Sequence, residues 1–250
     1  KATQAQSKLK QIERMEKVAA TTTEAPTFEF QFPQPARSGL KAITLEGVRH
    51  RYGDTPVYEH LDFMAERGQR ITLVGPNGAG KSVLLRLILE QEAPDAGEIR
   101  LGPSVKIGYY AQEHETLDPQ QTPLEAVRYA GEMSESNAVA FLIRYLFSYQ
   151  QVSQKIADLS GGERSRLQLA LLVLSSANFL LLDEPTNNLD VASAEVLENA
   201  LEDFEGTLLV ISHDRYFLDR TVHRLLVLEG GKVKEYQGGY SDYAAKLSLG

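Results

Sequence analysis

Short apolar runs alternate with amphipathic stretches from residue 41 onward. Four segments predict strands, the last two fully buried: KAITLEGVRHRYG (41–53), QRITLVG (69–75), FLLLDE (179–184) and TLLVIS (207–212). Apolar residues recur at helical spacing in SVLLRLILEQ (82–91) and SAEVLENALEDF (193–204). Strands that alternate with helices in this way indicate an α/β fold with a mostly parallel core sheet.

A mostly helical region interrupts this alternation. Its clearest segments are TPLEAVRYAGEM (122–133) and NAVAFLIRYLFSY (137–149), each of which we expect to form a helix. We therefore predict a helical subdomain inserted into the α/β domain over about residues 122–175.

The first 39 residues differ from the rest. Apolar positions at helical spacing predict an amphipathic helix over residues 1–18, with a basic solvent face: Ala5, Leu9, Ile12 and Met15. Residues 19–39 are enriched in Thr and Pro, and Phe28, Phe30 and Phe32 alternate as in an edge strand. We predict a tether followed by the first strand of the domain, and we expect the chain to be a piece of a longer protein.

Composition places the chain among globular proteins. Hydrophobic residues make up 42% of its 250 residues, enough for one large core or a core with a subdomain. The sequence has no cysteine, which excludes disulfides and thiolate metal sites and fits a reducing compartment. No apolar run approaches the roughly 18 residues of a membrane helix. We expect a soluble, cytoplasmic protein with no stable membrane domain.

Charge is distributed unevenly. The formal net charge is −8, but residues 1–18 carry five Lys or Arg against two Glu, or +3, which leaves −11 for the remainder. The overall charge argues against a protein that coats nucleic acid with its whole surface. The basic face of the first segment is either a solvated helix surface or a local contact with RNA.

The segment GPNGAGKS, from Gly75 to Ser82, fits the pattern G-x-x-x-x-G-K-[ST] between a predicted strand and a predicted helix. Backbone amides of such a loop converge on a phosphate, and the helix N-terminus adds its positive end. Lys81 is expected to reach the β- and γ-phosphates, and Ser82 to bind Mg²⁺. A glycine-rich turn without a ligand is the alternative.

Two acids end the buried strand FLLLDE. A carboxylate at the tip of such a strand is poorly solvated but well placed to hold Mg²⁺ beside the phosphates, so Asp183 is the predicted metal ligand. Glu184 points differently and is predicted to polarise an attacking water. Glu184 has a second interpretation, that of an acid at a helix start interacting with the helix dipole.

Two further polar residues follow predicted strands or lie near them. His213 comes after the strand TLLVIS, at the edge of the sheet where ligands gather in open α/β folds. It is predicted to donate to the γ-phosphate and orient the water, although a lone histidine there is often structural. Gln112, in GYYAQEH, offers an amide that could reach the metal and the water.

The segment LSGGERSRLQLALLVL (159–174) places Ser160, Gly161 and Gly162 directly before a long apolar helix. One interpretation is packing: the glycines form a tight turn and Ser160 caps the helix. The other is that the turn and the helix start form a cup of backbone amides that receives an anion. These residues alone do not exclude either.

Six motifs occur in one order: GPNGAGKS, Gln112, LSGGE, FLLLDEP, NNLD and SHD. This order resembles the Walker A, Q-loop, signature, Walker B, D-loop and H-loop of ATP-binding cassette ATPases, over residues 40 to about 230. The resemblance implies a P-loop NTPase fold with an antiparallel β part beside the core sheet. It also implies two cassettes that face each other head to tail, with Ser160 and Gly162 of one covering the γ-phosphate bound by the other.

The resemblance implies a set of site residues. Catalytic roles fall to Glu184, His213 and Gln112, and Mg²⁺ ligation to Ser82, Gln112 and Asp183. Tyr52 matches the aromatic residue that stacks on adenine, although a tyrosine packed on protein is the alternative. The implied nucleotide-binding residues are Tyr52, Gly75, Asn77, Gly78, Gly80, Lys81, Ser82, Val83, Ser160, Gly161, Gly162 and Asp190.

The segments DEPTNNLD, SHDRYFLDRTV and YQGGYSDY resemble the ABC-F family, whose members carry two cassettes on one chain and no membrane domain. Residues 1–38 resemble the end of the linker between those cassettes, and residues 39–250 the second cassette. The implied function is Mg²⁺-dependent ATP hydrolysis that regulates translation on the ribosome, with weak activity for an isolated cassette. The alternatives are the motor subunit of a membrane transporter and, less favoured, a DNA-repair cassette.

The implied partners are a second cassette, from the same longer chain or from a second copy, and ribosomal RNA bound through the linker.

Overall fold

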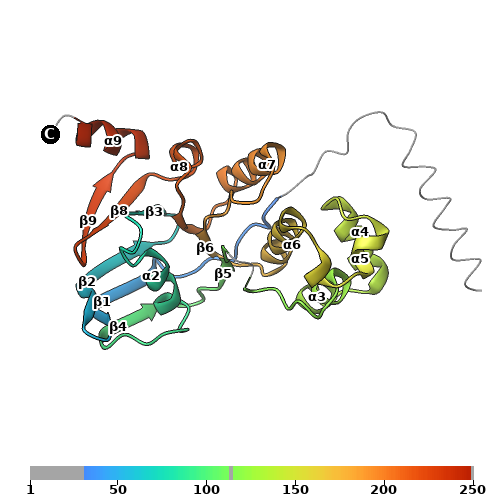
Figure 1. Ribbon diagram of the computed structural model, residues 1–250, viewed down its shortest axis with the longest axis horizontal. Coiled ribbons are helices and arrows are strands. Elements are labelled where there is room, and N and C mark those ends of the chain that lie inside the picture. The colour runs from blue at the N-terminus through green and yellow to red at the C-terminus, as the bar shows by residue number, and fades with distance from the viewer. Residues whose placement is uncertain (1–30, 113–114, 249–250) are drawn as a thin grey trace, which may run out of the picture.

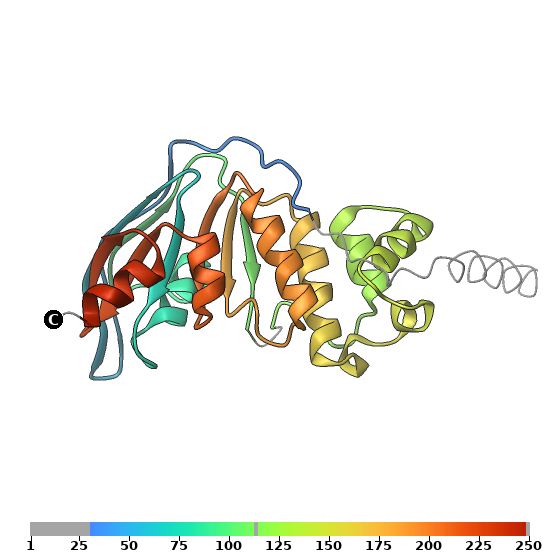
Figure 2. The same ribbon diagram turned by 90° about the horizontal axis from the view of Figure 1, so that it is seen from above.

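The computed structural model describes residues 31–112 and 115–248, with side chains to residue 246. The predicted basic helix over residues 1–18, and Phe28 and Phe30 of the predicted edge strand, lie outside the described residues. The described chain has two sheets side by side with helices between and around them, and a helical region projects from one end (Figures 1 and 2).

The larger sheet has six strands in the order β5-β6-β7-β3-β8-β9. All neighbours are parallel except the last pair, which is antiparallel. The predicted mostly parallel core sheet is therefore confirmed. Its strands span Ile107–Tyr110 (β5), Phe179–Asp183 (β6), Thr207–Ile211 (β7), Arg70–Val74 (β3), Arg224–Glu229 (β8) and Lys232–Gln237 (β9).

The smaller sheet has three antiparallel strands in the order β2-β1-β4, which confirms the expected antiparallel part. They span Lys41–Tyr52 (β1), Thr55–Glu66 (β2) and Ala96–Leu101 (β4). Helix α2 (Lys81–Ile88) lies between the two sheets, because its apolar side chains pack in one buried cluster with residues of both. The glycine-rich loop from Gly75 to Gly80, which precedes α2, is therefore held in place by the packing of this helix against both sheets.

The buried strands explain the two apolar layers. On β6, Phe179 and Leu181 pack toward α2, whereas Leu180 and Leu182 pack in the cluster on the opposite face. Successive side chains of a strand point to opposite faces, so a continuous apolar run fits a strand covered on both. Helices of the opposite face are α6 (Gly161–Leu174), α7 (Val191–Glu202) and α8 (Arg215–Thr221).

A series of helices lies between β5 and β6, in the stretch for which the sequence predicts an inserted helical subdomain. It contains α3 (Pro123–Gly131), α4 (Glu135–Arg144), α5 (Tyr149–Ser153), a short 3₁₀ turn (Ile156–Asp158) and α6. A last helix, α9 (Tyr240–Ser248), follows β9. None of the helices in the described part of the chain combines the length and apolar character that crossing a bilayer requires.

Two sequence predictions are wrong here. The predicted single helix over 137–149 ends at Arg144, because Leu146 has a left-handed φ of 60° and the amide of Phe147 turns back to the carbonyl of Leu142 at 3.1 Å. The predicted edge strand does not extend through Phe32, since residues 31–39 contain no strand and β1 begins at Lys41. Phe32 packs against Phe204 instead, with ring centroids 5.1 Å apart.

Candidate functional site

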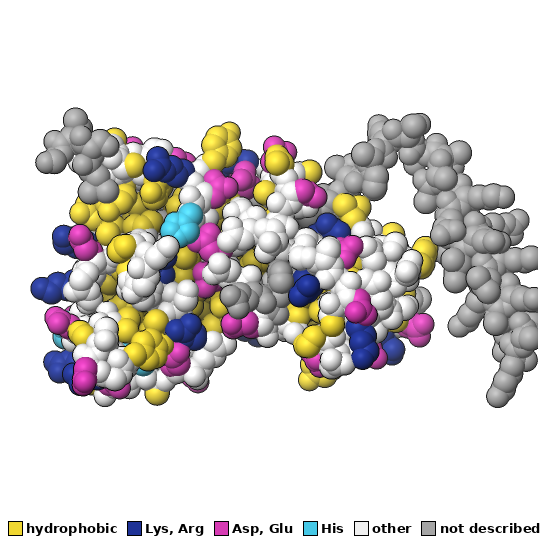
Figure 3. Space-filling model, in the orientation of Figure 1, with side chains coloured by type: hydrophobic (Ala, Val, Ile, Leu, Met, Phe, Trp, Pro, Cys, Tyr) yellow, Lys and Arg dark blue, Asp and Glu magenta, His cyan; other side chains and the backbone are white. Residues whose placement is uncertain are grey.

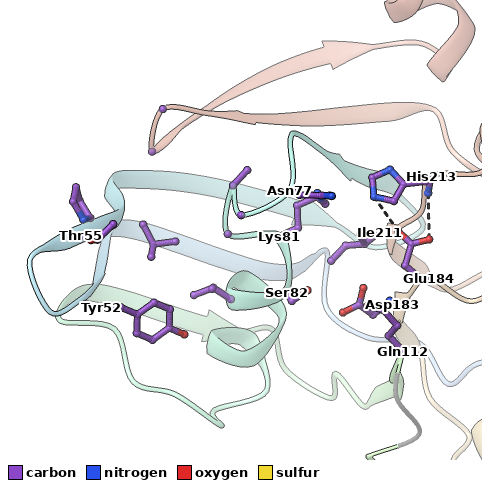
Figure 4. Close-up of a pocket in the computed structure, with 18 of the residues that line it drawn as sticks. Tyr52, Thr55, Asn77, Lys81, Ser82, Gln112, Asp183, Glu184, Ile211 and His213 are labelled. Carbon is purple, nitrogen blue, oxygen red and sulfur yellow. Dashed lines mark hydrogen bonds and ion pairs between the residues drawn. The ribbon is translucent and has the colours of Figure 1, made fainter.

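A cavity of about 1020 Å³ opens at the carboxyl ends of the core strands. The sequence-predicted residues that line it come from five separate segments: Tyr52, Asn77, Gly78, Gly80, Lys81, Ser82, Val83, Gln112, Asp183, Glu184 and His213. Tyr52 lies at one end, Glu184 and His213 lie at the other, and Lys81 and Ser82 lie between them (Figure 4). The fold thus brings the loop, both acids, the glutamine and the histidine to one place.

The loop from Gly75 to Gly80 has a backbone that requires glycine. Gly78 and Gly80 have φ of 80° and 99°, and a Cβ on Gly80 would lie 2.6 Å from Val57 Cγ1. The buried Tyr58 hydroxyl donates to the carbonyl of Gly80 at 2.6 Å. The Lys81 ammonium lies over the loop and donates to the carbonyl of Gly75 at 2.8 Å. Loop, helix start and lysine form the concave, donor-rich surface that a phosphate chain fits.

Asp183 ends β6 and is buried at the floor of the cavity. Burial raises the pKa of this carboxyl, and the Ser82 hydroxyl and the Lys81 ammonium oppose that shift. Within the described residues, no three carboxylate, imidazole or thiol side chains cluster to hold a metal by themselves. Asp183 and Ser82 instead fit Mg²⁺ as it occurs beside nucleotides, with few protein ligands and the remaining oxygens from phosphates and water.

Glu184 is turned away from Asp183 by its backbone. Its φ of 50° is left-handed, and its amide donates to the carbonyl of Ile211 at 2.8 Å. The carboxylate accepts a hydrogen bond from the His213 amide at 3.3 Å, and His213 Nε2 lies 3.5 Å from Oε1 (Figure 4). Burial raises the pKa of Glu184, and the His213 contacts lower it. Glu184 is not at a helix start, because the first residue of the next helix is Val191.

Tyr52 and Gln112 complete the cavity. Tyr52 lines the cavity and is 48% exposed. Gln112 follows β5, and Figure 4 shows it beside Asp183. Lining residues that the sequence analysis missed include Thr55, Asn187 and the Gly230–Gly231 turn. The two adjacent glycines between strands were a turn signal, but nothing in the sequence indicated that the turn faces the loop.

Five predicted site residues do not line this cavity: Gly75, Ser160, Gly161, Gly162 and Asp190. Of the packing interpretation, the tight turn at Gly161 and Gly162 is wrong, because both are the first residues of α6, whereas the cap by Ser160 is confirmed. Ser160 Oγ accepts from the amide of Glu163 at 3.3 Å, and Glu163 Oε2 accepts from the amide of Ser160 at 2.7 Å, which is a capping box. Asp190 similarly caps α7 by accepting from the amide of Ser193 at 2.7 Å.

Comparison with known proteins places this geometry in a family. The family model described as "ABC transporter" matches residues 58–187, which include the glycine-rich loop, the LSGGE segment and both acids at the end of β6. The chain belongs to this family. It is an ATP-binding cassette, and the glycine-rich loop and both acids of the matched segment line the cavity at the carboxyl ends of its core strands.

The curated relatives support the resemblance to ABC-F proteins. YdiF of Bacillus subtilis strain 168 is 42% identical over 245 residues, which are 97% of this chain and 38% of that protein. YheS of Escherichia coli strain K12 is 39% identical over 250 residues, which are 99% of this chain and 39% of that protein. The "Energy-dependent translational throttle protein EttA" of the same strain is 40% identical over 223 residues, which are 87% of this chain and 40% of that protein. The chain spans about two fifths of the length of each relative.

Solved structures show the same fold. One is a dimeric structure of a post-hydrolysis state of the ATP-binding cassette MJ0796 bound to ADP and Pi. It matches with a TM-score of 0.66 and 24% sequence identity, and the match covers 78% of this chain and 98% of that one. Another, a bacterial Atm1-family ABC exporter with ATP bound, has a TM-score of 0.72 and 22% identity over 95% of this chain and 45% of that one.

Proposed function

We propose that this cassette binds and hydrolyses Mg-ATP in a site that a second cassette completes. The observation that carries the proposal is the single cavity into which distant segments bring the glycine-rich loop, Lys81, Asp183, Glu184 and His213. A phosphate chain on the loop would place its last phosphate toward the two acids, because Glu184 and His213 lie at that end of the cavity.

Mg²⁺, when bound, neutralises developing charge on the phosphate oxygens. Ser82 and Asp183 would hold it, and Gln112, which lies beside Asp183, is the further candidate ligand. Lys81 contributes a fixed positive charge at the same phosphates. Burial of Asp183 strengthens its interaction with a cation, since charges attract more strongly away from water.

Glu184 is proposed to orient and polarise the attacking water. Its carboxylate is buried and raised in pKa, yet it faces the cavity, so it is a stronger base than an exposed glutamate. The exposed imidazole of His213 is 3.5 Å from that carboxylate, at the end of the cavity where the γ-phosphate would lie. The backbone hydrogen bond from His213 fixes Glu184 relative to the strand ends.

The LSGGE segment supports pairing of cassettes. Ser160 and Gly162 lie outside the cavity, at the N-terminus of a 14-residue helix whose positive end suits an anion. A second cassette arranged head to tail would bring its own Ser160 and Gly162 against the γ-phosphate of the first. The relatives are long enough to hold a second cassette, since this one covers only about two fifths of them.

We further propose that the whole protein acts in translation, as the name of its relative EttA says of that protein. In this proposal residues 1–38 are the end of a linker that contacts ribosomal RNA and residues 39–250 are the second cassette, in the cytoplasm. Acidic and basic side chains lie interspersed on the face of the cassette shown in Figure 3, so the +3 segment over residues 1–18 is the better candidate for an RNA contact.

The proposal is tested by replacing the proposed base. Glu184→Gln keeps the shape of the side chain but removes the carboxylate, so hydrolysis should fall by ~10²-fold or more while Mg-ATP binding persists. Lys81→Ala should instead weaken binding itself. Nucleotide affinity and phosphate release are measured for both variants and for the exposed Glu205→Gln control. Undiminished turnover by Glu184→Gln, in a protein with both cassettes, would remove Glu184 from the mechanism.

A further inference from the structure

Charged side chains surround the hydroxyl of Tyr52 at one end of the cavity. This hydroxyl donates to Glu92 Oε2 at 2.6 Å and accepts from Arg86 Nη2 at 3.0 Å. Arg86 Nε in turn donates to Glu92 Oε1 at 2.6 Å, so the three side chains close a ring of hydrogen bonds. His50 adds contacts with Glu92 and with the aromatic ring of Tyr52. We call Arg86, Glu92 and His50 the Tyr52 clamp.

The clamp holds the aromatic ring as well as its hydroxyl. The buried His50 imidazole meets the Tyr52 ring edge to face, with centroids 5.0 Å apart and planes at 85°. His50 Nε2 also lies 3.2 Å from the same Glu92 oxygen that accepts from Tyr52. Half of the Tyr52 surface is exposed, and the clamp fixes the orientation of a ring that would otherwise rotate.

Electrostatics favour the closed clamp. The hydrogen bond from Tyr52, and then that from Arg86, lower the pKa of Glu92, which therefore stays ionised at neutral pH. Hydrogen bonds to an ionised acceptor are about twice as strong as neutral ones. The Tyr52–Glu92–Arg86 triangle is thus held by charge-assisted bonds.

The clamp also connects Tyr52 to the phosphate loop. Arg86 lies in the last turn of α2, the helix that begins at Lys81, and Glu92 lies in the segment that follows this helix. Tyr52 is the last residue of β1, a strand of the smaller, three-stranded sheet. An α-helix is stiff over two turns, so the clamp fixes the separation between the Tyr52 ring and the loop at the start of α2.

We propose that Arg86 and Glu92 are positioning residues for the nucleotide base: they fix the Tyr52 ring in orientation and in distance from the phosphate loop. This rests on the proposed function, in which the Tyr52 ring is the surface that the base stacks on. The clamp then determines affinity for a nucleoside triphosphate but leaves affinity for a bare triphosphate unchanged, because a bare triphosphate has no base to stack.

The test measures binding of Mg-ATP and of Mg-tripolyphosphate to the full chain by calorimetry. Base stacking on an aromatic side chain is worth ~1–3 kcal/mol, so Tyr52→Ala should weaken ATP binding by roughly 5- to 100-fold. Tyr52→Phe and Glu92→Ala should each weaken ATP binding by about 3- to 10-fold, because the ring is kept but is no longer held in the orientation that favours stacking. The double variant should lose less than the product of the two single losses, because both substitutions remove the Tyr52–Glu92 hydrogen bond. Glu92→Gln, which retains an acceptor oxygen, should lose less, and Glu205→Ala is the control.

Three outcomes separate the inference from the proposed function. If Tyr52→Phe and Glu92→Ala bind ATP with full affinity while Tyr52→Ala binds it more weakly, the role of the clamp is overturned. The Tyr52 ring then remains the surface on which the base stacks. Equal losses for ATP and tripolyphosphate in Glu92→Ala would mean that Glu92 supports the loop alone, which also overturns the inference. Full ATP affinity in Tyr52→Ala would overturn the base surface itself. The inference is supported if Tyr52→Phe and Glu92→Ala both weaken ATP binding and leave tripolyphosphate binding unchanged.

Discussion

Two neighbouring carboxylates, Asp183 and Glu184, have different surroundings because of one backbone angle. Asp183 ends a regular strand and lies beside Ser82, whereas the left-handed φ of Glu184 turns its side chain toward His213. Non-glycine residues in this region are uncommon and cost of order 1 kcal/mol or more. Here the amide of Glu184 is held by Ile211 and its carboxylate by His213, which compensates that cost. The turn separates the proposed metal ligand from the proposed base.

Asp183→Asn is expected to raise stability at neutral pH. Burial raises the pKa of Asp183 above its usual 3.8, so the folded chain binds this proton more tightly than the unfolded chain. The resulting stabilisation is complete below the unfolded pKa and is lost as pH rises through the folded pKa. The amide never ionises, so the variant should melt higher than the parent at pH 8, by about 2–4 °C per kcal/mol.

Thermal unfolding at a series of pH values checks this. The difference between Asp183→Asn and the parent should shrink as pH falls through the folded pKa of Asp183, because below it the parent carboxyl is protonated as well. The exposed Asp203→Asn is the matched control and should show no such trend. An Asp183→Asn variant that melts below the parent at pH 8 would contradict the account.

At the scale of elements, reciprocal caps begin several of the helices between β5 and β6. Helices α3, α5 and α6 each start with a capping box, formed by Thr122 with Glu125, Ser148 with Gln151, and Ser160 with Glu163. The amide of Ser160 lowers the pKa of Glu163 by donating to its carboxylate. Ser160, which is proposed to serve a partner's site, therefore also stabilises its own helix.

Substitutions at Ser160 should separate these two roles. Ser160→Ala removes the cap and should lower the free energy of unfolding by about 1 kcal/mol. Ser160→Asp keeps a capping oxygen and should leave stability within about 0.5 kcal/mol of the parent, since Ser and Asp cap equally well. Urea unfolding of both variants measures the difference, with the exposed Ser136→Ala as reference. Equal losses for Ala and Asp would contradict the role of the cap.

Several features of the fold could be predicted because local patterns and tertiary packing agree. The runs FLLLD and TLLVI are apolar on both faces and do form strands buried on both. The end of α4 at Arg144 could not be predicted, because the apolar spacing continues to Tyr149 without glycine or proline. Tertiary packing places Tyr145 and Phe147 in the core and overrides that spacing.

The candidate site likewise has a part that the sequence predicts and a part that it does not. The glycine-rich loop could be predicted from its dense local motif. The two acids, Asp183 and Glu184, could be predicted because they come at the end of a buried strand. The clamp on Tyr52 could not, because Arg86 and Glu92 are ordinary helix and loop residues whose role depends on the packing of α2 against β1. Contacts between separate elements leave no periodic signal in a sequence.

At the scale of the whole molecule, charge separates the first 18 residues from the cassette. With +3 on that segment and −11 on the remainder, reversing Lys8, Lys10, Arg14 and Lys17 to Glu should weaken RNA association and flatten its salt dependence. ATP binding should hardly change. Ribosome co-sedimentation across a salt series measures the effect. The control reverses four exposed lysines of the cassette: Lys155, Lys232, Lys234 and Lys246.

Identical ribosome recovery at low salt for the parent and the segment variant would return residues 1–18 to a solvated helix face. Loss of recovery in the control variant as well would show that total charge, and not this segment, governs association.

The central claim is that one chain holds two half-sites. Lys81, Asp183 and Glu184 belong to one, and Ser160 and Gly162, outside the cavity, belong to the other. The most direct measurement is the ATPase rate per molecule across a dilution series, with molecular mass recorded at each concentration. The rate should rise with concentration as copies pair, and Ser160→Asp should abolish the rise without loss of ATP binding or stability, because it places a negative charge against the partner's γ-phosphate. A rate that stays constant across the series, with a monomeric mass throughout, would contradict the claim.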